Sequence, residues 1–480
     1  MKIKRIFAAL TVAATIAALA ACDRAAVENP AVTTVDVDLP PQTSARYTPD
    51  GRRIITIGTW QDLYFTSKHT DIYDDPTVPT LSDEDDEETR ADKERRIHIA
   101  EMRLANIRAI EERYNIVLES VNLTFEGVRE SIRVSVTEGV PDVDIYQVDS
   151  QFGIPAALEG HAMALEDIGL AGTDVFDRQL VTKHLKLTGQ DKSYLFNQSL
   201  SGSISAYPLA FNLDMLLAAG LENPQDLYDR GEWTWEVWEE YLRVLTKDTD
   251  GDGEPNIYGY SGYWTDMLRN LLMSNGAGIA QSAVQTLDSA PTREVLDFIH
   301  TLYNTDKTAR PWDGANWEIN NTLYAEGLSA FWIGADWIFN QQGGAELPFE
   351  IGVVPWPCGP SGNAETNSYS SPDTNWFMIP VGAEDAELIY NVIFDWLNWY
   401  DYDLTIGDDR NWSRTNYMTP RNYDYAVMMS QKQGFDLWDS LSRTTGFSLY
   451  SLLQGEQDTQ GVIEGYSAPF QAALDKYFGN

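Results

Sequence analysis

Three aspartates alternate with other residues between Lys247 and Gly253, and their carboxylates could bind a metal ion. Asp248, Asp250 and Asp252 occupy positions 1, 3 and 5 of an EF-hand-type calcium loop, and Gly253 supplies the sharp bend at position 6. Carboxylates this close together repel one another unless a hard cation neutralises them. The spacing therefore predicts a Ca²⁺ site with a structural rather than a catalytic role.

The rest of the calcium-type pattern is incomplete. Glu254 would offer its backbone carbonyl at position 7, and Asn256 stands at position 9. At position 12, where an EF-hand has a bidentate glutamate, this chain has Gly259, so a carboxylate from elsewhere would have to complete the shell. A hydrated acidic turn after a helix is the alternative interpretation.

Catalytic motifs find little support in the sequence. There is no Gly-x-Ser-x-Gly, His-Glu-x-x-His or phosphate-binding Gly-Lys-Ser/Thr run, and the five histidines show no metal-ligand spacing. Cys358 lies in a Pro-Cys-Gly-Pro run that is typical of a turn. Paired carboxylates could serve a glycoside hydrolase or lyase, but among 73 acidic residues such pairs are expected by chance. We therefore expect a protein that is not an enzyme and requires no cofactor, with a surface glycoside hydrolase or lyase as the alternative.

The amino end has the layout of a secretory signal peptide. Basic residues at positions 2, 4 and 5 precede an apolar stretch from Ile6 to Ala21, which is too short for a good membrane span. The run Leu19-Ala20-Ala21-Cys22 resembles the lipobox of bacterial lipoproteins. This resemblance implies that residues 1–21 are removed, that Cys22 receives lipid such as palmitate, and that the protein is anchored at the outer face of the cytoplasmic membrane. An ordinary secretory signal that contains a cysteine is the alternative.

The composition describes an acidic body that is rich in aromatic rings. With 34 Lys and Arg against 73 Asp and Glu, the net charge of -39 repels nucleic acid and anionic lipid head groups, so no nucleic-acid partner is expected. The 480 residues, 43% of them apolar, suffice for one large or two moderate domains, and two cysteines provide no disulfide framework. The 15 Trp and 24 Tyr supply flat rings that can stack on sugars. An aromatic cleft in an acidic body favours neutral sugars over anionic ligands.

Alternating segments after a linker indicate a parallel sheet covered by helices. Residues 22–50 are expected to form an extended linker, followed by ordered chain from Arg53. We expect strands at 54–57, 116–121 and 143–148, helices at 97–114 and 128–137, and an acidic loop up to residue 92. The carboxyl ends of parallel strands meet at one edge of a sheet, where ligands collect. Trp60 and Asp149 follow two of these strands, so both are predicted to lie at that edge.

A second series of segments starts near residue 206. We expect strands at 206–212, 351–355 and 375–379, helices at 215–219, 234–245 and 387–399, and a mostly helical end from 423 to 478. The sequence shows no internal repeat of fixed period.

Several local motifs, taken in order, resemble the extracellular solute-binding proteins of ABC sugar importers, in the branch that includes maltose-binding protein. The motifs are Pro141–Tyr146, Ala206–Asn212, Gly231–Glu236, Glu326–Gly334 and Ile351–Pro357. Each motif is weak alone, but together they span roughly residues 53–420 in the family's order, behind a lipobox. The acidic insert around residues 67–92 departs from the family pattern.

The resemblance implies an α/β fold of the two-lobe, type II periplasmic-binding-protein kind. Each lobe would be a mixed sheet flanked by helices, with lobe I at 51–208 and 355–410, lobe II at 209–354 and 411–480, and hinge strands between them. A ligand in the cleft would favour the closed form, which a monomeric protein presents to the transmembrane subunits of a permease. The expected function is binding of an extracellular carbohydrate, with an oligosaccharide preferred. A peptide or another polar solute on the same fold is a further alternative.

The resemblance also places candidate ligand contacts in the cleft. Aromatic rings would stack on the sugar, and planar polar groups would donate and accept paired hydrogen bonds. The residues predicted for these roles are Trp60, Asp149, Gln151, Tyr263, Trp264, Trp332, Asp336, Trp337, Asn375 and Trp376. A single tryptophan is more often a core residue than a binding platform, which is the alternative for each of the five.

Overall fold

The computed structural model describes residues 45–169, 192–196, 206–312, 322–334, 347–370, 376–400 and 417–478. All of them lie in one compact unit of the chain, Pro41–Asn480. Four residues with predicted roles, Cys22, Asp336, Trp337 and Asn375, lie outside the described residues. Among the described helices, none combines the length and the apolar character that crossing a membrane requires.

The first sheet has a parallel centre, as the sequence predicts. Its strands are β1 (Arg46–Tyr47), β2 (Arg53–Thr59), β3 (Ile116–Asn122), β4 (Ile145–Val148) and β10 (Trp376–Met378). β2 pairs in parallel with β3 and β4, whereas β1 and β10 add antiparallel edges. β1 lies inside the predicted linker, so order begins before Arg53. Its pairing with β2 closes a hairpin, in which Gly51 adopts a φ of 90°.

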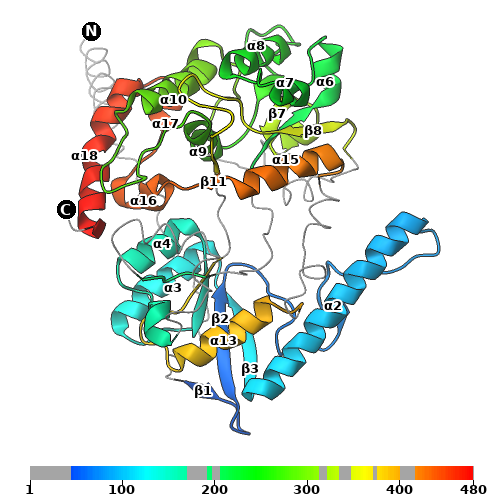
Figure 1. Cartoon of the computed structure of the whole chain (residues 1–480), viewed down its shortest axis with the longest axis vertical. Helices are drawn as coiled ribbons and strands as arrows, with labels where there is room; N and C mark the ends of the chain where they lie inside the picture. The colour runs from blue at the N-terminus through cyan, green and yellow to red at the C-terminus, as the bar shows by residue number, and fades with distance from the viewer. Residues whose placement is uncertain are drawn as a thin grey trace, which may run out of the picture. The chain divides into compact units, whose positions relative to one another are not determined.

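Helices cover both faces of this sheet. They are α2 (Glu87–Tyr114), α3 (Phe125–Glu138), α4 (Ser150–Leu158) and α13 (Ala386–Leu397), with a short turn η2 (Leu165–Ile168). Apolar residues of α2 and α13 form one core with Ile55 and Ile57 of β2, and α13 lies across the sheet in Figure 1. Side chains alternate along a strand, so Gly58 points to the other face. There the Tyr146 hydroxyl bonds to Ser131 of α3 at 2.7 Å.

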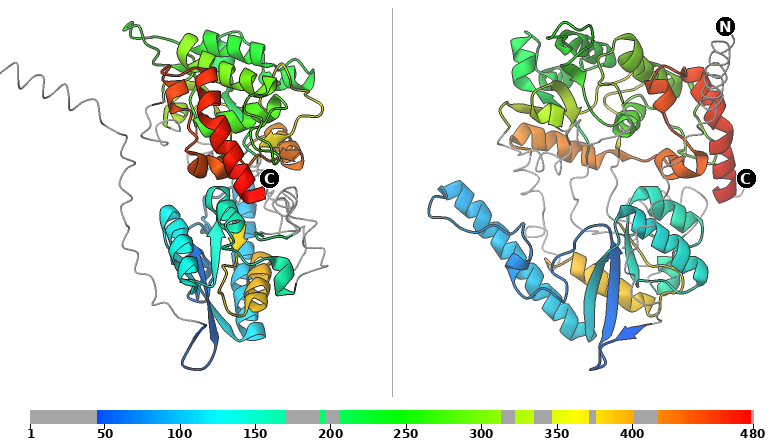
Figure 2. Two further views of the ribbon diagram at one scale, coloured as in Figure 1. Left: turned by 90° about the vertical axis from the view of Figure 1, so that its left-hand side faces the viewer. Right: turned by 180° about the vertical axis from the view of Figure 1, so that it is seen from behind.

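Helix α2 begins earlier than the sequence predicts. The acidic stretch up to residue 92 was expected to be a loop, but α2 starts at Glu87, and Asp86 caps it by accepting a hydrogen bond from the Thr89 amide. Acidic side chains in a first helical turn are stabilised by the amide groups exposed there, which explains why the charges do not exclude a helix. The turn η1 (Ile72–Asp74) lies in the segment before it. α2 contacts η1 and extends well beyond the sheet (Figure 2).

The motif Pro141–Tyr146 has a structural role at the centre of the first sheet. Asp144 forms a buried ion pair with Arg53 and accepts a hydrogen bond from the Thr56 amide at 2.8 Å. The Arg53 side chain is only 5% exposed. This carboxylate therefore ties the entry of β4 to the start of β2.

The second sheet has the order β6-β7-β5-β8. Its strands are β5 (Leu209–Asn212), β6 (Tyr258–Tyr260), β7 (Ser329–Ile333) and β8 (Ile351–Val354). β6 and β7 are parallel, and β5 is antiparallel to β7 and β8. The surrounding helices are α6 (Leu213–Ala218), α7 (Pro224–Asp229), α8 (Trp235–Leu245), α9 (Trp264–Ser274), α10 (Ala290–His300) continued by the π-helical turn η4 (Thr301–Thr305), and α15 (Pro420–Gln431). A separate two-stranded ladder joins β9 (Tyr369–Ser370) to β11 (Gln433–Gly434).

The chain ends in three helices, α16 (Trp438–Thr445), α17 (Tyr450–Leu453) and α18 (Thr459–Phe478). α16 packs against both α4 and α18. The segment before α16 is held by Asp436, which accepts hydrogen bonds from the amides of Ile279 at 2.6 Å and Ala280 at 2.9 Å. The fold is thus mixed α/β with two mixed sheets flanked by helices, as expected.

Candidate ligand-binding site

The carboxyl edge of the first sheet carries the two residues predicted there. Gly58 of β2 is in register with Tyr146 of β4, so Trp60 and Asp149 leave the sheet at the same edge. Asp149 is 7% exposed and caps α4, accepting a hydrogen bond from the Gln151 amide at 2.7 Å. The predicted placement is confirmed, and Asp149 has a structural role there as well.

Trp60 forms an aromatic group with two phenylalanines that the sequence analysis missed. Its ring meets Phe125 at 5.7 Å and Phe152 at 5.8 Å, in both cases edge to face. Trp60 is partly exposed, whereas Phe152 is buried. Edge-to-face packing holds the indole in place and is compatible with a ligand ring stacked on its face. Phe125 and Phe152 lie in the first turns of separate helices, α3 and α4, so nothing in the sequence signalled that they meet.

A cavity of about 210 Å³ lies where α3 and α4 meet α16. Gln151 and Phe152 both line it. Phe152 belongs to the aromatic group around Trp60, so this group borders the cavity. Its polar lining consists of Arg129, Arg133, Gln151, Glu159, His161, Ser440, Arg443 and Thr444. Of the described residues with predicted ligand roles, Gln151 is the one that reaches this cavity.

Aromatic side chains also gather at one edge of the second sheet. Trp264 follows β6 and is 6% exposed, and its ring contacts Trp438 and Tyr450 at 6.2 and 6.0 Å. Tyr450 is 45% exposed and stacks on Trp312 at 6.1 Å, with their planes 13° apart. Ala309 bridges in parallel to Tyr260 of β6, so Trp312 leaves the sheet near Trp264.

Trp312 and Tyr450 are candidate functional residues that the sequence analysis did not find. Each stands in a segment without a recognisable motif, and only folding brings them together. The neighbouring predicted residue, Tyr263, is partly exposed and caps the start of α9 through its backbone position. The high tryptophan and tyrosine content was the only sequence signal for such a group of rings, and composition does not show which rings are exposed.

Two other predicted tryptophans are buried. Trp332 is 0% exposed and stacks on Tyr324 at 4.7 Å within the core of the second sheet. Trp376 is 3% exposed and pairs with Val148 across β10 and β4. Such burial is typical of core residues, because both faces of the ring are packed against protein. Ligand contact by either residue stays a prediction, as it does for Asp336, Trp337 and Asn375.

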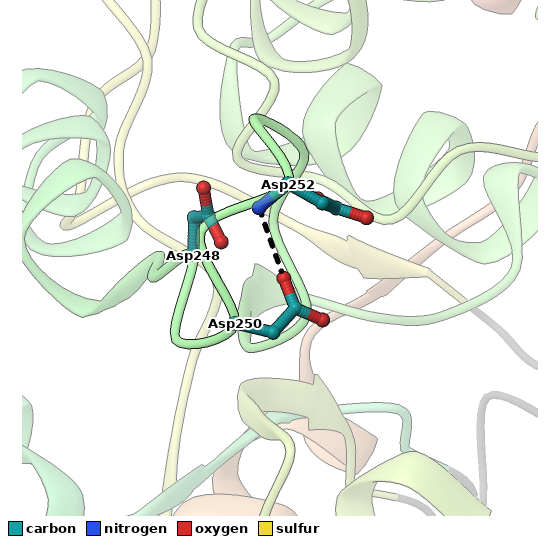
Figure 3. Close-up of side chains that lie close together, drawn as sticks. All are labelled: Asp248, Asp250 and Asp252. Carbon is teal, nitrogen blue, oxygen red and sulfur yellow. Dashed lines mark hydrogen bonds between the residues drawn. The ribbon is translucent and has the colours of Figure 1, made fainter.

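The three aspartates of the calcium-type loop converge at the surface, after α8 (Figure 3). Each offers a carboxylate oxygen, and these oxygens lie within 4.8 Å of one another. Asp248 accepts hydrogen bonds from the amides of Gly253 at 2.9 Å and Gly251 at 2.6 Å, which lower the pKa of its carboxyl. The loop thus holds three hard oxygen donors together, which is a donor set that suits Ca²⁺.

The other residues of the pattern make contacts within the protein. The Glu254 carboxylate pairs with Lys307 at 3.2 Å, while the Asn256 side-chain oxygen accepts from the Thr249 amide at 3.0 Å. Because its carboxylate pairs with Lys307, the predicted metal ligand from Glu254 is its backbone carbonyl. Asn256 would have to share its side-chain oxygen with the Thr249 amide.

The chain belongs to a family of bacterial extracellular solute-binding proteins. Residues 108–400 match the model of the family described as "Bacterial extracellular solute-binding protein". The match covers more than half of the chain and includes β3, β4 and β10 of the first sheet and all four strands of the second. The resemblance noted in the sequence is thereby confirmed. No curated protein matches the chain.

Solved structures of two-lobe solute-binding proteins share the fold. An ABC substrate-binding protein from Listeria monocytogenes, in complex with cycloalternan, has a TM-score of 0.60 at 14% identity, covering 89% of this chain and 99% of that one. A maltose/maltodextrin-binding domain from Bdellovibrio bacteriovorus bound to maltotriose has a TM-score of 0.56 at 14% identity, covering 88% of this chain and 99% of that one. UgpB from Mycobacterium tuberculosis, in complex with glycerophosphocholine, has a TM-score of 0.58 at 15% identity, covering 78% of this chain and 95% of that one. At these identities the likeness establishes the two-lobe, type II fold.

Proposed function

We propose that this protein binds an extracellular carbohydrate, preferably an oligosaccharide, and delivers it to the transmembrane subunits of an ABC permease. Sugar rings stack on tryptophan and tyrosine, while amides and carboxylates at the sheet edges hydrogen-bond the hydroxyl groups. Ligand contacts made only in the closed form favour closure about the hinge, and the permease recognises that form. The protein itself makes or breaks no bond.

The observation that carries the proposal is the pair of aromatic groups at the two sheet edges. Trp60, partly exposed, stands beside Asp149 and Gln151 at one edge, and the exposed ring of Tyr450 stacks on Trp312 at the other. Carboxyl edges of α/β sheets are where ligands of such folds bind. Two of the similar structures hold oligosaccharides, which supports the ligand class.

The test is binding to a broad panel of oligosaccharides, measured by calorimetry. Native mass spectrometry of freshly purified protein comes first, because a retained ligand would direct the choice of panel. We expect saturable binding to at least one glycan with one site per chain. Absence of binding across the panel would contradict the proposal.

Two alternatives have separate readouts. The similar structure that contains glycerophosphocholine favours a same-fold protein for another polar solute, which the mass of a retained ligand would reveal. A surface glycoside hydrolase or lyase would release new reducing ends from a polysaccharide, and we expect none.

We further propose that Cys22 carries a lipid anchor at the outer face of the cytoplasmic membrane, and that the body works as a monomer. The lipobox-like sequence before Cys22 supports the anchor. Replacing Cys22 with Ser should move the protein from the membrane fraction to the soluble fraction. We also propose a structural Ca²⁺ at Asp248, Asp250 and Asp252, supported by their convergence.

A further inference from the structure

The cavity between α3, α4 and α16 has the opposite charge balance from the rest of the chain. Three arginines, Arg129, Arg133 and Arg443, line it together with a single carboxylate, Glu159. Over the whole sequence, acidic residues outnumber basic ones by 73 to 34. Glu159 is itself engaged by the Tyr477 hydroxyl at 3.0 Å. Cationic lining of this kind raises the local concentration of anions even when the net charge of the protein is negative.

The arginines come from two separate parts of the chain. Arg129 and Arg133 lie one turn apart on α3, and Arg443 lies on α16. Glu126 accepts from Arg129 at 3.0 Å and from Arg443 at 2.8 Å, and so joins the two helices. Glu130 accepts from Arg133 through Nε at 2.9 Å. These partners are carboxylates, which is the chemistry that a guanidinium group fits best.

A ligand carboxylate can compete for these arginines. Their side chains are 40–66% exposed, and ion pairs in such positions contribute little to stability. A guanidinium group has five N–H donors, so each arginine can bind a further acceptor while it keeps its glutamate. Gln151 and Ser440 add neutral hydrogen-bonding groups, and Phe152 adds an apolar ring edge. This combination suits a polar ring that carries one negative charge.

The size of the cavity limits what it can hold. Its volume of about 210 Å³ is far larger than the roughly 10–15 Å³ that one water needs. It is smaller than the pockets of about 300–1,000 Å³ that enclose a drug-sized ligand. The cavity therefore suits one sugar residue of a longer ligand, and it adjoins Gln151 at the predicted binding edge.

We infer that this cavity is a subsite for an acidic sugar, and that the ligand is an oligosaccharide containing a uronate. The inference builds on the proposed function and names its substrate class. A carboxylate bound between α3 and α16 would add a second acidic link between the arginines of the two helices, beside the one that Glu126 already makes. It would thereby favour the arrangement in which α16 packs against α4. This inference differs from the prediction of a neutral ligand, which was based on the acidic chain and an aromatic cleft, and the experiment below decides between the two.

The experiment compares uronate trisaccharides with their neutral, carboxyl-reduced forms. Galacturonate, glucuronate, mannuronate and guluronate trimers are titrated calorimetrically into the wild-type protein and into Arg133→Gln and Arg443→Gln. Arg230→Gln is the matched control, because Arg230 is 45% exposed and pairs with Glu222 and Glu232 away from the cavity. Because all three arginines are exposed, we expect the variants to fold, and circular dichroism checks that they do.

We expect one uronate trimer to bind at least tenfold more tightly than its reduced form. We also expect each cavity variant to weaken that binding by roughly tenfold or more, with Arg230→Gln unchanged. Equal or tighter binding of neutral sugars would overturn the inference and leave the proposed function standing. Uronate binding that is insensitive to Arg133 and Arg443 would overturn the assignment to this cavity. If no carbohydrate bound at all, the proposed function would fail together with the inference.

Discussion

Gly259 lies so close to Leu242 that a Cβ atom on the glycine would come within 2.8 Å of the Leu242 Cα atom. Gly259 belongs to β6 and Leu242 to α8, and this contact lets the strand pack directly on the helix. The same glycine stands at position 12 of the calcium-type loop, where a glutamate ligand is usual. Packing thus explains why the pattern ends without its last carboxylate.

The first prediction concerns calcium. Ca²⁺ should raise the melting temperature of the protein, and a chelator should reverse the effect; at about 100 times the dissociation constant the stabilisation is about 2.7 kcal/mol. Asp250→Asn should abolish the shift, because it removes one of three converging carboxylates. Asp214→Asn, an exposed aspartate of α6, is the control. A calcium-induced shift that persists in Asp250→Asn would contradict the site.

Restoring the missing ligand should not help. Gly259→Glu is expected to lower the stability of the protein without increasing its calcium affinity, because its side chain has no room against Leu242. Thermal melts with and without Ca²⁺ measure both effects. A stable variant with tighter calcium binding would show that the carboxylate can reach the loop.

The second prediction separates binding rings from core rings. Tyr450→Ala and Trp60→Ala should weaken oligosaccharide binding by about 1–3 kcal/mol, which is several-fold to a hundredfold in the dissociation constant. Both side chains are at least partly exposed, so the fold should tolerate their loss. Trp332→Ala should instead lower the free energy of unfolding by about 3–5 kcal/mol, because Trp332 is buried against Tyr324. Calorimetry and urea unfolding measure the two effects, and unchanged affinity in both exposed variants would remove those rings from the site.

Much of the fold could be predicted because the spacing of hydrophobic residues within a segment indicates which of its side chains are buried. The strands β2, β3 and β4 and the helices α3 and α13 match their predicted places closely, since each buries one regular face or run of residues. The strand β1 was missed because two residues have no period. The start of α2 was missed because Asp86 acts through a local cap and not through apolar spacing.

The candidate site was less predictable, for a physical reason. Strand ends can be read from the sequence, so the shared edge of Trp60 and Asp149 was foreseen. The stacking of Tyr450 on Trp312 and the arginine-lined cavity depend on contacts between distant segments. A single sequence also does not distinguish an exposed tryptophan from a buried one such as Trp332.

The third prediction is a pH dependence of stability centred on His69. Burial lowers the pKa of His69 below its usual 6.5, aided by the charge of Lys68, and its Nδ1 lies 3.1 Å from the Thr66 amide, from which it accepts a hydrogen bond. Because the folded state favours the neutral ring, His69 contributes stability above pH 6.5. This contribution is lost as the pH falls through the lowered pKa.

Replacing His69 with Gln isolates this effect. Gln can still accept from the Thr66 amide but does not titrate, so the stability of the variant should fall less steeply between pH 7 and pH 5. Urea unfolding at a series of pH values in that window gives the free energy of unfolding of each protein. The difference between the two proteins isolates His69, because the many carboxylates common to both contribute equally and cancel. Identical slopes would show that His69 is not the titrating group.

The last prediction tests the structural role of Asp144. Asp144→Ala should lower the free energy of unfolding by about 3–5 kcal/mol, because it removes the close, buried carboxylate of the Arg53 guanidinium, which is 5% exposed, and the acceptor of the Thr56 amide. The half-exposed Asp385, 3.6 Å from Arg53 Nε, is a weaker partner and compensates little. Asp50→Ala is the control: Asp50 pairs with Arg52, and both are exposed, so its loss should change stability little. Urea unfolding followed by circular dichroism compares the two variants. Equal effects would mean that the Asp144 carboxylate gains nothing from its buried position and does not stabilise the junction of β2 and β4.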